Sequence, residues 1–187
     1  MVSGSRLFYA ALLLFCVSVP SVAQLKAPSS RMSLVVDYAR FRGDENNVYV
    51  EVYYAFPQRG LTYVADASRF KGGVELTITV TAADSMHFAD RLMVPHVTSD
   101  TSGSTMNLVS SSNMMLREGE YILKVVGKDA NNSARRDSAT MRLSVKLPPT
   151  DKLVLSDIEF AASVKKGKPG APFYKNTLEV VPNVDGV

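Results

Sequence analysis

Strict alternation of apolar and polar residues is the feature that most constrains how this chain can fold. In "VYVEVYYAF" the alternation puts Val48, Val50, Val52, Tyr54 and Phe56 on one face of an extended strand, and Tyr49, Glu51, Tyr53 and Ala55 on the other. The segments "VELTITVTAAD" from Val74, "YILKVVGKD" from Tyr121 and "ATMRLSVKL" from Ala139 alternate in the same way. Because a period of two fits a strand with one face in a core, these segments predict half-buried antiparallel strands.

Turn-forming residues separate the predicted strands. "RGDENN" (residues 42–47) and "KDANNS" (residues 128–133) each link two consecutive strands, which predicts two hairpins, and Gly72-Gly73 is expected to be a turn. Short strands at this spacing, without helices between them, predict an all-β, immunoglobulin-like antiparallel β-sandwich over residues 34–147.

A second, shorter β segment is expected after the sandwich. Pro148-Pro149 interrupts strand pairing and marks a boundary. Beyond it, "LVLSDIEFA" and "LEVVPN" are two strand candidates, separated by a loop rich in lysine, glycine and proline. Residues 148–187 are therefore either the start of a second β domain or a C-terminal β extension.

The first 23 residues have the pattern of a secretory signal peptide. Arg6 precedes an apolar run over residues 7–19, and Ser21-Val22-Ala23 supplies the small residues of a cleavage site. That run is too short to span a bilayer comfortably, and no other stretch of the sequence reaches a transmembrane length. We expect residues 1–23 to be removed, residues 24–33 to be a linker, and the protein to be exported to the periplasm, the outer envelope or the extracellular medium.

The cysteine content and the charge distribution argue against a lipoprotein, a disulfide-stabilised protein and a nucleic-acid-binding protein. The only cysteine, Cys16, lies in the apolar run after Phe15, where a lipoprotein signal has a small residue. The mature chain then has no disulfide, so a hydrophobic core must supply its stability. The net charge of +3 is spread among interspersed charges, which does not indicate nucleic-acid binding.

"LREGEY" indicates a tyrosine corner. Leu116, the turn residue Gly119 and Tyr121 at the start of a strand have the order of this motif, in which the phenol hydroxyl closes a turn onto nearby backbone. The alternative is an ordinary core tyrosine at a strand start.

No constellation of residues carries a catalytic or metal-binding signature. His87 and His96 are nine residues apart, so they fall on opposite faces of one strand unless a bulge intervenes. The acids are scattered through turns and strand ends, and no nucleophile motif or phosphate-binding loop is present. Asn131-Asn132-Ser133 is a formal glycosylation sequon within a turn. We expect no enzyme activity, no cofactor and no metal.

Tyr49, Glu51 and Tyr53 form a possible ligand or partner face. If this face is exposed, its two aromatic rings offer a platform on which a sugar or a peptide can stack. The alternative, which the sequence favours, is cross-strand pairing or cover from a following domain.

Several phrases together resemble the N-terminal region of GWxTD-domain proteins, a family of secreted or envelope proteins of bacteria. They are Asp37-Tyr38 and Phe41, Tyr53-Tyr54 and Pro57, Leu155-Ser156-Asp157-Ile158, and Pro182-Asn183. The resemblance covers most of the predicted mature chain, although the motif that names the family is absent because the chain has no tryptophan. It implies an envelope location and a β-sandwich, and it implies no catalytic activity.

The sequence thus predicts a non-catalytic, secreted or envelope-associated module with a structural or protein-interaction role. Its expected partner is another envelope protein or downstream domains of a longer protein, not nucleic acid, and no transmembrane segment is left after signal cleavage. Two alternatives are a carbohydrate-binding module that uses Tyr49 and Tyr53, and an assembly factor that works by β-strand addition, for which "VELTITVT" must be unpaired. A hydrolase would need a cleft that brings His87 or His96 to an acid.

Overall fold

The computed structural model describes residues 32–83, 85–101 and 106–184. The predicted signal peptide (residues 1–23), Cys16 and most of the predicted linker lie outside the described residues. Within the described part of the chain, no helix is long and apolar enough to cross a membrane.

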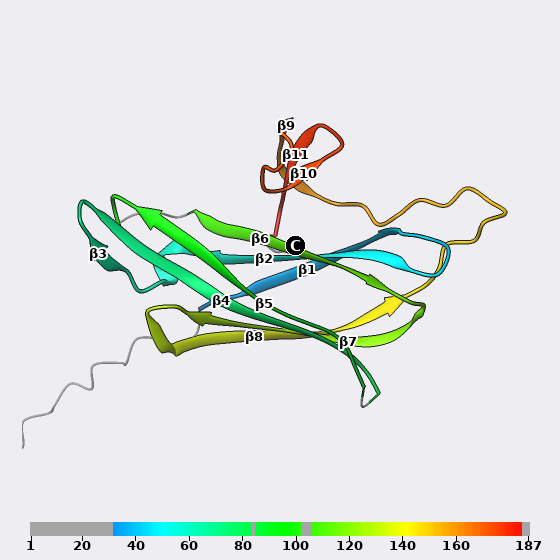
Figure 1. Ribbon diagram of the computed structural model, residues 1–187, viewed down its shortest axis with the longest axis horizontal. Coiled ribbons are helices and arrows are strands. Elements are labelled where there is room, and N and C mark those ends of the chain that lie inside the picture. Colours follow the sequence, from blue (N-terminus) through cyan, green and yellow to red (C-terminus); the bar gives the residue numbers. More distant parts are fainter. Residues whose placement is uncertain (1–31, 84, 102–105, 185–187) are drawn as a thin grey trace, which may run out of the picture.

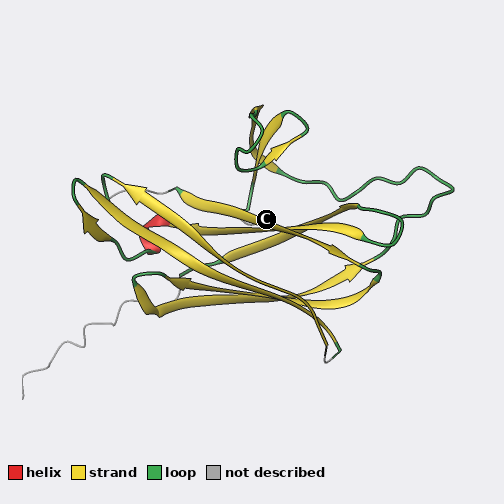
Figure 2. Ribbon diagram, viewed as in Figure 1, coloured by secondary structure: helices red, strands yellow, loops and turns green. Residues whose placement is uncertain are grey.

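Two antiparallel sheets form the body of the molecule (Figure 1). The first contains β1 (Val35–Arg42), β2 (Val48–Pro57) and β6 (Asn107–Leu116). The second contains β3 (Val64–Asp66), β4 (Arg69–Ala82), β5 (Ser85–Thr98), β7 (Gly119–Asp129) and β8 (Asn132–Val145). In the described residues the one helical turn is η1 (Gln58–Gly60), drawn red in Figure 2. The prediction of an all-β antiparallel sandwich is confirmed.

The strand order is that of an immunoglobulin-like fold. β2 lies between β1 and β6, while β4 pairs with β7 and with β5, and β7 pairs with β8. In the usual lettering, β1, β2 and β6 take the places of strands A, B and E, and β5, β4, β7 and β8 those of C′, C, F and G. β1 with β2 and β7 with β8 form the two hairpins that the turn residues predict.

The core lies between the two sheets and consists of the inward-facing half of each alternating segment. Most of its fully buried side chains come from β2, β4, β7 and β8, and they include Val50, Val52, Tyr54, Leu76, Ile78, Val80, Leu123, Val125 and Leu143. Each such aliphatic side chain contributes about 1.5–3 kcal/mol when removed from water. The face assignments read from the alternation are therefore correct for these strands.

One local expectation about β4 is wrong. Gly72-Gly73 is not a turn: both residues lie inside β4, opposite His96 and Pro95 of β5. A Cβ atom at Gly73 would lie 2.7 Å from the carbonyl oxygen of Val94, so glycine here allows close approach of two strands. "VELTITVT" does not meet the condition for β-strand addition, because it pairs with β5 on one side and β7 on the other.

Residues 150–184 form a connecting segment followed by a separate small sheet. We call the segment and the sheet together the arm. The sheet contains β9 (Ala161–Lys166), β10 (Tyr174–Lys175) and β11 (Leu178–Pro182) in the order β10-β11-β9. Figure 1 shows it, in orange to red, over the outer face of the sheet made by β1, β2 and β6. β11 confirms the strand predicted in "LEVVPN". The strand predicted over residues 153–161 is wrong, because β9 begins only at Ala161.

The turn between β6 and β7 has the hydrogen bond of a tyrosine corner. The hydroxyl of Tyr121 donates to the carbonyl oxygen of Arg117 over 3.1 Å. Leu116 is buried, and a Cβ atom at Gly119 would lie 3.2 Å from the Tyr121 ring. The ring therefore folds back over a residue without a side chain and fixes the link between the two sheets.

We predict that Tyr121→Phe lowers the free energy of unfolding by about 1 kcal/mol, because it leaves the buried ring in place and removes one hydrogen bond. Urea denaturation measures the change. Tyr174→Phe is the matched control, since the Tyr174 hydroxyl has no hydrogen-bond partner among the described residues. An equal loss in both variants would show that the Arg117 contact contributes nothing specific.

Candidate functional site

The outer face of β2, where the sequence places a possible binding platform, is covered. Tyr53 is 3% exposed and Glu51 is 8% exposed. The Tyr53 hydroxyl donates to the Glu51 carboxylate over 2.7 Å, and burial followed by this hydrogen bond raises the pKa of Tyr53. Tyr49 is half-buried, with its ring centroid 6.3 Å from that of Phe41. Two exposed rings for stacking are thus not available on this face.

A lysine of the arm covers this face. Lys175 in β10 forms an ion pair with Glu51, and its ammonium lies 2.7 Å from the Glu159 carboxylate and 3.3 Å from the Tyr53 hydroxyl. It also lies over the rings of Phe41 and Tyr53, at 5.5 and 5.3 Å from their centroids. Burial lowers the pKa of Lys175, but the hydrogen bonds to Glu159 and Glu51 outweigh it and leave the pKa raised. We call these charged and aromatic side chains the Lys175 cluster.

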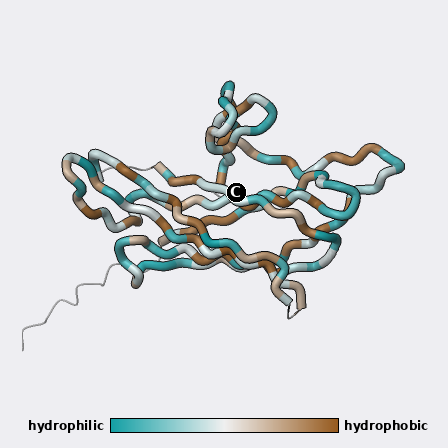
Figure 3. The backbone as a smooth tube through the Cα atoms, in the orientation of Figure 1, coloured by the Kyte–Doolittle hydropathy of each residue, from teal (hydrophilic) through white to brown (hydrophobic). Residues whose placement is uncertain are grey.

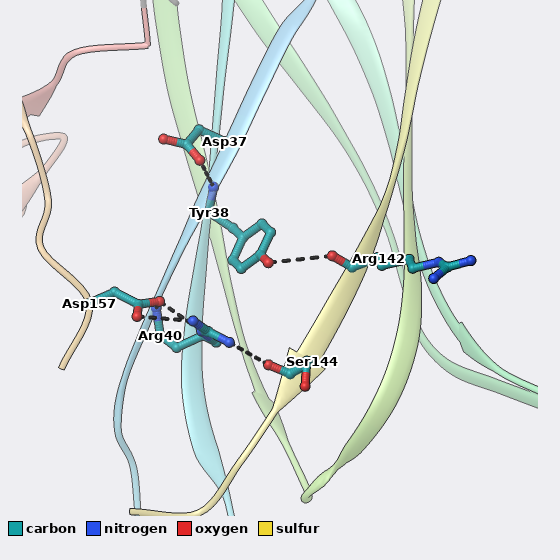
Figure 4. Close-up of polar contacts among 6 residues, drawn as sticks. All are labelled: Asp37, Tyr38, Arg40, Arg142, Ser144 and Asp157. Atoms are coloured by element: carbon teal, nitrogen blue, oxygen red, sulfur yellow. Dashed lines mark hydrogen bonds and ion pairs between the residues drawn. The ribbon is translucent and has the colours of Figure 1, made fainter. Parts of the chain in front are cut away.

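Side chains of β1 cover the free edge of β8 (Figure 4). The Tyr38 hydroxyl donates to the carbonyl oxygen of Arg142 over 3.4 Å, and the guanidinium of Arg40 donates to that of Ser144 over 2.6 Å. Since alternate carbonyl groups of an edge strand point away from its single neighbour, these two contacts occupy acceptors that another chain would otherwise pair with. They also join the two sheets on this side of the sandwich.

Arg40 holds the arm as well. Its guanidinium binds both carboxylate oxygens of Asp157, at 2.7 and 3.1 Å, as Figure 4 shows. The backbone N–H of Arg40 donates to the same carboxylate over 2.9 Å, and the backbone N–H of Asp157 donates to the Arg40 carbonyl oxygen over 3.1 Å. The hydrogen bond with Arg40 lowers the pKa of Asp157 despite the opposing effect of burial. Arg40 thus connects β1, β8 and the arm.

A groove lies beside this contact, between the sandwich and the arm. Its volume is about 370 Å³. Apolar residues from both sides line much of it, namely Phe41, Val48, Leu147, Pro148, Pro149, Val154 and Leu155. Arg42 and Lys146 also line it, and neither has an acidic partner among the described residues. We call this the junction groove.

The arm carries a row of exposed apolar side chains where it approaches the sandwich. Leu153 is 94% exposed, Leu155 85%, Ile158 79% and Phe160 69%. We call these four residues the apolar ridge, and hydrophobic residues colour much of this segment brown in Figure 3. Single exposed apolar residues are normal on protein surfaces, whereas several large ones within one short segment indicate a candidate interaction site.

The two histidines do not share a site. A bulge in β5 leaves His87 outside the strand register, and its ring lies against Tyr121, with centroids 5.2 Å apart. His96 lies towards the other end of β5, where its Nδ1 is 2.8 Å from the Tyr63 hydroxyl, and burial lowers its pKa. Among the described residues, no group of three or more side chains is arranged to hold a metal ion.

The residue that opens the predicted sequon has a structural role. The side-chain amide of Asn131 donates to the carbonyl oxygens of Thr62 and Lys71, at 2.9 and 3.0 Å. The buried carboxylate of Asp129 accepts from the backbone N–H groups of Thr62 and Asn131, at 2.7 and 2.9 Å. These contacts fix the β7–β8 turn against the loop before β3.

Sequence reasoning missed the residues that attach the arm. Arg40 and Asp157 are 117 positions apart, and Lys175 is 124 positions from Glu51. No local spacing signals pairs so distant. The one available signal was chemical, since an acid and two tyrosines alternated on the face of β2 opposite to the core.

Comparison with protein-family models, with curated proteins and with solved structures finds nothing that matches this chain. The resemblance to GWxTD-domain proteins stays a prediction.

We predict that Lys175→Met lowers the free energy of unfolding by about 2–4 kcal/mol, because it leaves two largely buried carboxylates without their cation. The double variant Glu51→Gln/Lys175→Met should recover part of this loss, since it removes one of those charges. Urea denaturation and limited proteolysis within residues 150–156 measure stability and arm attachment.

Lys166→Met, in exposed β9, is the matched control for this prediction. If Lys175→Met and Lys166→Met behave alike, the Lys175 cluster does not hold the arm.

The contact between Arg40 and Asp157 should make stability depend on pH. The pKa of Asp157 is lowered in the folded state, so its contribution is present above its ordinary pKa of 3.8 and is lost as pH falls through the folded value. Arg40→Gln should therefore reduce the stability lost between neutral pH and about pH 3. Urea midpoints at both pH values test this. The pKa of Asp44 is also lowered, but Asp44 is present in both the parent protein and Arg40→Gln, so its effect cancels in the comparison. If both proteins lose the same stability between the two pH values, the prediction is wrong.

Proposed function

We propose that this protein is a non-catalytic, exported protein-interaction module that presents the apolar ridge of its arm to another protein. The single observation that carries the proposal is the exposure of four large apolar side chains within eight positions of one another, Leu153, Leu155, Ile158 and Phe160. Leaving such a group in water is unfavourable, and covering it with a partner removes that cost.

The attachment of the arm supports this proposal. Asp157, in the middle of the ridge segment, is bound to Arg40 through side-chain and backbone hydrogen bonds. Glu159, also within the segment, is bound to Lys175. Because the segment is fixed at these two positions, the ridge is displayed in one orientation, and a partner does not have to offset the full entropy of ordering it.

Other features support a role in binding rather than in catalysis. Tyr53 and Tyr54 are buried parts of the scaffold, and the histidines lie apart, each against a tyrosine. The signal-peptide pattern and the resemblance to GWxTD-domain proteins support export and association with a bacterial envelope. Burial of Tyr53 argues against the carbohydrate-binding alternative, which needs that ring in solvent.

β-strand addition is a second candidate, with β9 in place of the segment that the sequence indicated. Among the strands that the structure describes, β9 lies at the end of its sheet and pairs only with β11, and all six of its residues are exposed. An extended segment of a partner could pair with this free edge while its side chains contact the neighbouring ridge.

Crosslinking in the producing cell tests the proposal. A photoreactive amino acid placed at Ile158 or Phe160 should give a discrete adduct with another protein, and the same group at Thr79, in β4 of the five-stranded sheet, should not. The ridge variant Leu153→Ser/Ile158→Ser/Phe160→Ser should abolish an adduct formed from position 155. Its stability should stay within about 0.5 kcal/mol of the parent because the replaced side chains are exposed. Equal crosslinking from the apolar ridge and from Thr79 would contradict the proposal that the ridge is the interaction surface.

A further inference from the structure

The junction groove has the features of a ligand site that differs from the surface proposed above, with which it shares only Leu155 of the apolar ridge. Sandwich residues form one wall and Val154 and Leu155 of the arm form the other. Its volume of about 370 Å³ falls in the range of small-molecule and peptide side-chain sites. The hydrogen bonds between Arg40 and Asp157 hold the two walls together, so the groove is preformed.

The charges that line the groove favour an anion. The guanidinium of Arg40 is satisfied by Asp157 and by the Ser144 carbonyl oxygen. Arg42 and Lys146, in contrast, line the same groove without an acidic partner among the described residues. Two unpaired cations beside an apolar floor suit a ligand whose carboxylate lies next to an aliphatic group.

Acids beyond the groove limit how much negative charge the ligand can carry. A second hollow shares Arg42, Leu147 and Pro148 with the junction groove, and Asp44 and Glu45 line it. The Asp44 carboxylate is already engaged with the backbone and side chain of the loop, where it accepts from Asn46 and Asn47. A ligand with several negative charges would be repelled by these acids more strongly than a ligand with a single carboxylate.

We propose that the junction groove captures the C-terminal residue of a protein or peptide that ends in an aliphatic side chain. At a free C-terminus the carboxylate and the side chain leave the same Cα atom, so one residue can reach Arg42 or Lys146 with its charge and the apolar floor with its side chain. In an internal acidic residue, the carboxylate is at the end of a side chain, so more bonds separate it from the nearest aliphatic side chain than at a free C-terminus. The groove is too small for more than a few residues, which agrees with recognition of a chain end.

Fluorescence anisotropy with the full chain tests this proposal. The probe is an N-terminally labelled peptide Gly-Ser-Gly-Val-Leu with a free C-terminus, compared with the same peptide as its C-terminal amide. We expect the amide to bind about tenfold more weakly, as loss of one charge-assisted contact implies. Binding of the free acid should weaken as salt is raised, since exposed cations are screened.

Variants assign the binding to the groove. Arg42→Gln and Lys146→Gln should each weaken binding of the free acid about tenfold, which corresponds to one charge-assisted contact. Lys124→Gln, on an exposed position of β7 away from the groove, should leave binding unchanged. Circular dichroism establishes that each variant is folded. Equal affinity for acid and amide, or full affinity in both groove variants, would overturn the proposal.

Two further probes separate the chain end from other carboxylates. An amidated peptide with an internal glutamate, Gly-Ser-Glu-Val-Leu, should bind as weakly as the first amide. Hexanoate should displace the free-acid peptide only at higher concentration than the unlabelled peptide does. Binding of the glutamate peptide as tight as that of the free acid, or displacement by hexanoate at lower concentration, would refute capture of a C-terminal residue. Leu155 belongs to both surfaces, but Leu153, Ile158 and Phe160 of the apolar ridge do not line the groove, so these results do not depend on those three side chains.

Discussion

Burial of both faces of β2 is the constraint on which the rest of the structure depends. Its inner face, with Val50, Val52 and Tyr54, lies in the core against the larger sheet. Its outer face, with Tyr53 and Ala55, is covered by the end of the arm, where Val184 is buried with them. β2 is also central in its sheet, because it pairs with β1 along one edge and with β6 along the other. The arm therefore completes the fold of the first sheet and is more than a tail attached to it.

Directional polar contacts decide where the arm lies, and apolar burial alone does not. Few apolar side chains are buried between the arm and the sandwich. The Lys175 cluster and the contacts of Arg40 with Asp157 instead fix position and orientation, because charge-assisted hydrogen bonds require specific distances and angles. Holding the arm in this way leaves its apolar ridge in solvent and opens the junction groove beside it. The same contacts that attach the arm thus create both surfaces to which we assign binding.

The inner faces of the strands could be read from the sequence because apolar alternation is local. Val74, Leu76, Ile78 and Val80 are all buried, as their spacing indicates. The turn predicted at Gly72-Gly73 was wrong because glycine occurs both in turns and where two strands approach closely. Only the position of the neighbouring strand shows which of these applies. The segment at residues 153–161 has the composition of a strand, yet among the described residues its backbone contacts β1 only at Asp157 and the β11 end of the arm only at Phe160 and Ala161. A high β-strand propensity does not produce a strand where no neighbouring strand is available for hydrogen bonding.

The sequence by itself determined the β class, the two hairpins and the inward faces of β2, β4, β7 and β8, and it indicated a tyrosine corner, since these follow from periodicity and turn chemistry over a few residues. The tertiary structure alone decided that Glu51 and Tyr53 are covered, that Lys175 binds there, and that Arg40 joins β1, β8 and the arm. These contacts link residues more than one hundred positions apart. Such pairs form only when the whole chain is folded, because nothing in the local sequence of one partner specifies the other.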